Sequence, residues 1–118
     1  MRTHKDLDVW KLSLELAKDV FQITGRFPRE VAFTLVNQIT RSAISIPSNI
    51  AEGAGRVSKK EFSNFISIAL GSVSELETQL YLARELNYTV DSAVFLKIER
   101  VGKMLVMLRR KLRQPPQP

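Results

Sequence analysis

Apolar residues recur at intervals of three and four along most of the chain, which is the period of an amphipathic helix. Four segments carry this pattern, residues 8–24, 29–52, 58–86 and 90–112, and short turn-forming stretches separate them. Connections this short force neighbouring helices to run antiparallel. The pattern therefore predicts an all-α fold, an antiparallel up-down-up-down four-helix bundle built from residues 1–113.

Local signals mark the ends of these helices. Asp6 or Asp8 is placed to cap the first helix, and Gly25 to end it. Ser58 and Glu61 have the spacing of a capping box at the start of the third helix. Residues 114–118 contain three prolines and cannot continue the fourth helix, so they are predicted to form a disordered tail.

Phe33 is predicted to belong to the inward-facing stripe of the second segment. The same segment contains two residues that disturb helices, Pro47 and Gly53. Pro47 lies inside the pattern and removes a backbone hydrogen bond, which predicts a kink near Ala43, one turn upstream. Gly53 is predicted to adopt the left-handed conformation that ends many helices.

Composition narrows the class of protein. A length of 118 residues fits one domain with a core of its own. The absence of cysteine excludes disulfides and thiolate metal sites. The polar first residues contain no signal-peptide core, and no apolar run approaches the roughly 20 residues of a membrane span. We expect a cytoplasmic protein with no membrane association.

Catalytic residues are scarce. His4 is the only histidine and lies at the N-terminal end, so the many serines have no histidine base. The Glu-x-x-His pairs of a di-iron bundle are missing too. The sequence predicts a protein that is not an enzyme and has no metal or cofactor.

The net charge of +6 is concentrated in the fourth helical segment. Lysine and arginine balance aspartate and glutamate over residues 1–96, whereas residues 97–113 hold seven cations and only Glu99. A local cationic stripe attracts polyanions better than dispersed charge does. The predicted nucleic-acid-binding residues are Lys97, Arg100, Lys103, Arg109, Arg110, Lys111 and Arg113. A merely solvated basic face is the competing interpretation.

A second set of polar residues spans the second and third helices: Ser45, Asn49, Glu52, Arg56, Ser72, Glu75 and Gln79. We favour a hydrogen-bonded network that fixes the register of the two helices over a ligand pocket. Removing Asn49 or Glu52 is then expected to reduce stability. Gly71, in mid-helix, predicts the close approach of the second helix or of a neighbouring subunit. Asn37, Gln38 and Arg41 are candidates for a partner surface or a solvated face.

Two stretches are distinctive as sequence: residues 45–56, SIPSNIAEGAGR, and residues 68–80, IALGSVSELETQL. With Trp10 and Leu86-Asn87-Tyr88, they resemble the four-helix-bundle family named for reading frames in intervening sequences of 23S rRNA genes. The likeness covers about residues 7–108. Leu70 stands where this family usually has a polar residue.

The resemblance implies a bacterial, cytoplasmic bundle that assembles as a homopentamer. The chain is also similar, more distantly, to accessory proteins of diversity-generating retroelements. That similarity implies binding to nucleic acid (RNA or DNA) and to a reverse transcriptase.

The residues and the resemblance together lead to one main hypothesis: an oligomeric bundle that binds nucleic acid through backbone phosphates, as an accessory scaffold. The alternative is a structural or protein–protein interaction module whose basic face is only solvated. Surplus apolar residues in the first helix, Leu7, Leu14 and Ile23, indicate that the protein is not a monomer.

Overall fold

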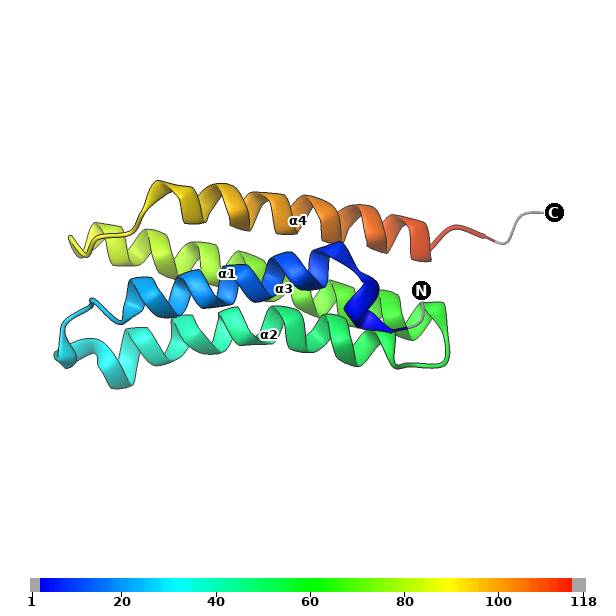
Figure 1. Ribbon diagram of the computed structural model, residues 1–118, viewed down its shortest axis with the longest axis horizontal. Helices are drawn as coiled ribbons and strands as arrows, with labels where there is room; N and C mark the ends of the chain where they lie inside the picture. Colours follow the sequence, from blue (N-terminus) through cyan, green and yellow to red (C-terminus); the bar gives the residue numbers. More distant parts are fainter. Residues whose placement is uncertain (1–2, 116–118) are drawn as a thin grey trace.

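The computed structural model describes residues 3–115. Its four main helices are α1 (Asp8–Thr24), α2 (Asn37–Ala54), α3 (Lys59–Glu85) and α4 (Ser92–Leu112). Each runs antiparallel to the one before it, and the bundle measures 56 × 21 × 19 Å (Figure 1). No strand occurs among residues 3–115. The predicted all-α four-helix bundle is confirmed.

The core consists of one stripe from each helix, because residues spaced by three and four share a helix face. These stripes meet along the bundle axis and exclude water. Their fully buried members are Leu16 and Val20 of α1, Ile39, Ile46 and Ile50 of α2, Ile66, Leu76 and Leu80 of α3, and Ile98, Val101 and Leu105 of α4. None of the described helices has the length and apolarity to cross a membrane.

The connection between α1 and α2 differs most from the prediction. A 3₁₀ turn at Arg29–Val31 leads into a π-helical stretch at Ala32–Val36, and regular α-helix begins only at Asn37. The expectation that Phe33 faces inward is wrong, since its side chain is 91% exposed. A π turn holds more residues than an α turn, which shifts the side chains around the axis. Leu35 packs against the core in this stretch instead.

The C-terminal end of α2 corrects the prediction made for Gly53. Pro47 is buried within α2, which continues as one element to Ala54. Gly53 does not take the left-handed conformation; it is buried inside α2, and the cap is Gly55 with φ −83°. Gly53 is needed for packing, because a Cβ placed there would lie 2.6 Å from the Cβ of Phe65 on α3.

Side-chain caps begin three of the described helices. Ser58 accepts a hydrogen bond from the Glu61 amide at 3.1 Å, which is one half of the predicted capping box. The return bond from the Ser58 amide to the Glu61 side chain is not among the hydrogen bonds of the described residues. Asp91 accepts a hydrogen bond from the Ala93 amide at the start of α4. Thr3 caps a 3₁₀ turn at His4–Asp6 by accepting from the Lys5 amide, and the Asp6 carboxylate accepts from the Thr3 amide in return. The expectation that Asp6 or Asp8 caps the first helix is wrong, because Leu7 precedes α1 and no side chain caps that helix. Gly25 ends α1 as expected.

Helix α4 ends at Leu112, and Gln114 and Pro115 are not helical. The prediction of a disordered tail covers residues 114–118, and residues 116–118 of this range lie outside the described residues.

Candidate nucleic-acid interface

The cations of α4 do not lie on one face of the helix. Arg100 and Arg109 are nine residues apart, which is two and a half turns and therefore opposite sides. Lys97 faces α1, where its Nζ lies 2.6 Å from the Asp19 carboxylate. Lys103 pairs with Glu99 on its own helix at 3.0 Å. Two of the seven predicted residues thus already have carboxylate partners.

Arg109 and Arg113 face α3. The Arg113 Nε donates to the Ser63 hydroxyl at 2.8 Å, and the Arg109 Nη1 donates to the Ser67 hydroxyl at 3.2 Å. Neither arginine has an ion pair with a described residue. These bonds fix where the guanidinium groups lie without neutralising their charge.

The antiparallel order places the last turn of α4 beside the start of α3 (Figure 1). The α2–α3 turn and the first turn of α3 add Arg56, Lys59 and Lys60 at the same end of the bundle. We call this the basic end, and define it by Arg56, Lys59, Lys60, Arg109, Arg110, Lys111 and Arg113. Glu52 and Glu61 are the only carboxylates in residues 52–61 and 109–113.

Four side chains of the basic end are exposed and unpaired. Lys59, Lys60, Arg110 and Lys111 have no ion pair with any residue between 3 and 115. Arg56 differs, because it pairs with Glu52 at 2.6 Å and its guanidinium stands 4.9 Å from the centre of the Phe65 ring. Exposed, uncompensated cations clustered at one end suit the phosphates of a nucleic-acid backbone.

The predicted polar set separates into parts. Asn49 donates to the backbone oxygen and the hydroxyl of Ser45 at 2.8 and 2.9 Å, and Ser45 bonds to Ser72 of α3 at 2.8 Å. These three residues form a network that ties α2 to α3. Glu52 and Arg56 form a separate, exposed ion pair.

The rest of the polar set lies outside this network. Glu75 is exposed, while the buried Oε1 of Gln79 has no hydrogen-bond partner within the described part of the chain. The set as predicted is therefore not one pocket.

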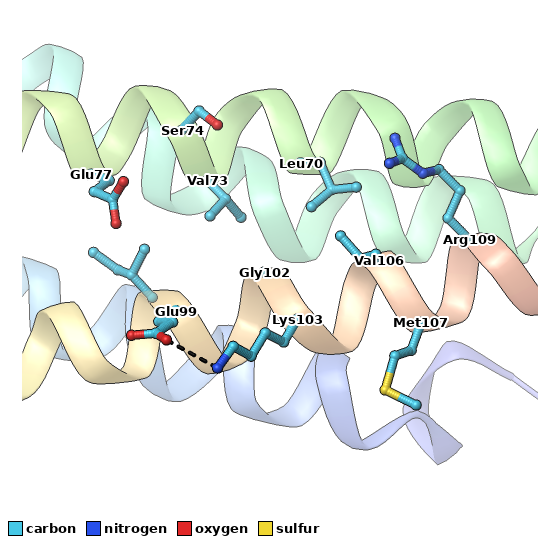
Figure 2. Close-up of a pocket in the computed structure, with 11 residues that line it drawn as sticks. Leu70, Val73, Ser74, Glu77, Glu99, Gly102, Lys103, Val106, Met107 and Arg109 are labelled. Carbon is cyan, nitrogen blue, oxygen red and sulfur yellow. Dashed lines mark ion pairs between the residues drawn. The ribbon is translucent and has the colours of Figure 1, made fainter.

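A groove of about 550 Å³ runs between α3 and α4 on the outside of the bundle (Figure 2). Leu70, Val73, Val106 and Met107 give it an apolar lining, and Gly102 leaves room between the helices. The groove begins beside Arg109 of the basic end.

Further exposed residues mark the outer face of α2 and α3. Ile44 and Ile68 are each about half exposed. A Cβ added to Gly71 would meet nothing within 4 Å, so the predicted close approach of the second helix to Gly71 is wrong. Asn37, Gln38 and Arg41 are exposed.

The lone histidine has a structural contact. His4 meets the Trp10 ring edge-on, with 4.9 Å between ring centres. Within residues 3–115, no three His, Asp or Glu side chains gather in a way that would hold a metal ion.

The fold and the site define an all-α bundle with a cationic end and an open apolar groove. The family model for the 23S rRNA-intervening sequence protein matches residues 5–108. The chain belongs to this family, and the resemblance seen in the sequence is confirmed. A search of the curated proteins finds no match.

Proposed function

We propose that this protein is a non-enzymatic, oligomeric bundle that binds nucleic acid through backbone phosphates at the basic end. The observation that carries the proposal is the convergence of seven cations from residues 52–61 and 109–113 on one end, while these two stretches hold only two carboxylates, Glu52 and Glu61. Only Arg56 among these cations has a carboxylate partner among the described residues. Phosphate contacts give affinity without reading sequence, so we expect little base specificity.

The family supports the proposal through its name, which connects these proteins with intervening sequences of 23S rRNA. RNA and DNA are therefore both candidate ligands. A reverse transcriptase as partner, the role of accessory scaffold and a cytoplasmic location belong to the same proposal and rest on the resemblance alone.

Self-association is the second part of the proposal, and the groove between α3 and α4 supports it. An open apolar groove between two helices is the kind of surface that receives a helix of another molecule. A second copy could fill this groove with exposed apolar side chains from its other helices. These are Leu14 and Phe21 on α1, Ile44 on α2 and Ile68 on α3. We propose the groove as one side of the contact between copies, in a homopentamer as the resemblance implies.

The test of nucleic-acid binding is its dependence on salt. Each phosphate neutralised by the protein releases a counterion, so four to six contacts give a log–log slope of roughly −3 to −5 on duplex DNA. Fluorescence polarisation with a labelled RNA strand and a DNA duplex, between about 50 and about 200 mM salt, measures this slope. Replacing Arg109, Arg110, Lys111 and Arg113 by Gln should weaken binding to unrelated sequences about equally.

The matched control replaces Lys97 and Lys103, which have carboxylate partners, by Gln and should bind like the wild type. Leu105 stays in the core of all these variants, so the bundle should remain folded. If the wild type does not bind at about 50 mM salt, the structural-module alternative becomes the better interpretation.

A further inference from the structure

Two serines of α3 hold two arginines of α4 in place. Ser63 and Ser67 lie one helical turn apart, and so do Arg109 and Arg113, each pair about 6 Å apart along its helix. Besides the two bonds given above, the Arg113 Nη2 lies 3.4 Å from the Ser67 hydroxyl. Ser63 is 3% exposed and Ser67 half-buried, so the acceptors are anchored in the contact between the helices.

The chemistry of these contacts distinguishes them from ion pairs. A serine oxygen is a neutral acceptor, so it orders a guanidinium group and leaves the positive charge uncompensated. Arginine has five N–H donors, and one or two bonds to serine leave the others free. Each serine hydroxyl still has its own hydrogen to donate, for which residues 3–115 supply no acceptor.

A hollow of about 440 Å³ opens beside Arg113. It is lined by Lys60, Ser63, Asn64, Leu112 and Arg113. Its lining contains no carboxylate and supplies donors from ammonium, guanidinium, amide and hydroxyl groups. Such a set of donors suits an anion with several oxygens.

We propose that this hollow binds one phosphodiester group of the nucleic-acid backbone, held by Arg113 of its lining with Arg109 one helical turn away, and with Ser63 and Ser67 as positioning residues. The inference rests on the proposed function and deepens it. Arg109 and Arg113 act here through geometry as well as charge, because their side chains are ordered before the ligand arrives. Arg110 and Lys111, which have no partner in the described chain, contribute charge alone.

The first experiment changes the geometry and keeps the charge. The double variant Ser63→Ala, Ser67→Ala should weaken binding of an RNA strand about tenfold with an unchanged salt slope, because the arginines become disordered but remain charged. Ser74→Ala, at an exposed serine of the same helix, is the matched control and should bind like the wild type. Ser67→Thr keeps the hydroxyl and should bind within about twofold of the wild type.

A second pair of variants separates fork geometry from charge. Arg109→Lys, Arg113→Lys should weaken binding about tenfold, since lysine cannot form the planar fork. Arg110→Lys, Lys111→Arg should leave affinity unchanged. Equal effects of the two double variants, or wild-type affinity of Ser63→Ala, Ser67→Ala with its melting unchanged, would overturn the inference.

A third arm uses inorganic phosphate alone, measured as a rise in Tm. The rise should be present in the wild type and clearly smaller in Arg109→Lys, Arg113→Lys. If phosphate stabilises the wild type in this way but no strand binds, the site is correct and the proposed nucleic-acid function is wrong. If strands bind with a steep salt slope but phosphate has no effect and the serine variant binds normally, the function stands and this site is wrong.

Discussion

Gly53 of α2 and Phe65 of α3 approach so closely that a Cβ on Gly53 would lie 2.6 Å from the Phe65 Cβ. A Phe62 ring carbon lies 3.0 Å from the same position. Since real Cβ atoms almost never approach within 3.0 Å of another heavy atom, Gly53→Ala must push α2 and α3 apart. We expect a loss of about 1–2 kcal/mol in unfolding free energy: about 1–3 for overpacking, reduced by alanine's better helix propensity.

Gly71→Ala is the matched control for that measurement. The glycine is exposed in mid-helix with open space around it, so alanine should stabilise the fold by about 1 kcal/mol through helix propensity alone. Urea denaturation of both variants at the same protein concentration tests the pair. Equal effects of the two substitutions would show that the close packing at Gly53 is unimportant.

Lys97 and Arg110 should behave in opposite ways. Lys97→Gln removes a half-buried ion pair with Asp19 and should lower the unfolding free energy by up to about 1 kcal/mol while leaving binding to RNA intact. Arg110→Gln touches no partner and should leave stability within about 0.5 kcal/mol, but reduce the steepness of the salt slope by about one. Denaturation and polarisation measured on both proteins decide this; a loss of binding in Lys97→Gln would speak against it.

Substitution of Asn49 and of Glu52 by alanine should differ in the loss of stability, although the sequence predicts a loss for both. Asn49→Ala removes two hydrogen bonds in the network that joins α2 to α3, and should lower the unfolding free energy by about 1–2 kcal/mol. Glu52→Ala removes one exposed ion pair and should cost at most about 0.5 kcal/mol. Guanidinium denaturation measures both. Destabilisation by Glu52→Ala as large as that by Asn49→Ala is the contrary outcome.

The groove between α3 and α4 can be tested through the molecular mass in solution. Val106→Asp places a charge in the lining of the groove and should reduce the mass toward the 13.4 kDa of one chain. Val57→Asp changes a fully exposed valine of the α2–α3 turn, outside the groove, and should leave the mass unchanged. Light scattering at micromolar concentration reads out both, and a wild type that is itself monomeric would refute self-association.

The fold was predictable from the sequence because helix periodicity and end signals are local. The stripe from Val94 to Leu105, the Ser58 cap and the stop at Gly25 all depend on residues within a few positions of one another. The outward turn of Phe33 was not predictable, because a π turn follows from how the α1–α2 connection enters the bundle. Gly53 reads as a helix stop unless the position of Phe65 on another helix is known.

The site was predictable only in part, for the same physical reason. The clustering of cations on α4 is visible in the sequence. The sequence does not show which of these cations face α1, which face α3 and which face solvent. Lys60 and Arg113 are far apart in the chain and line the same hollow. Serines such as Ser63 carry no signal as arginine anchors until the packing of α3 on α4 places them.

The basic end is one of the two small faces of a body 56 Å long and 21 by 19 Å across. A nucleic acid held there crosses the tip of the rod, so one copy covers only about 20 Å of it, roughly six base pairs at 3.4 Å per pair. Most of the protein then projects away from the nucleic acid, and the α1–α2 and α3–α4 connections at the other end of the bundle stay accessible. The length of nucleic acid protected from nuclease should therefore increase in proportion to the number of copies bound to it.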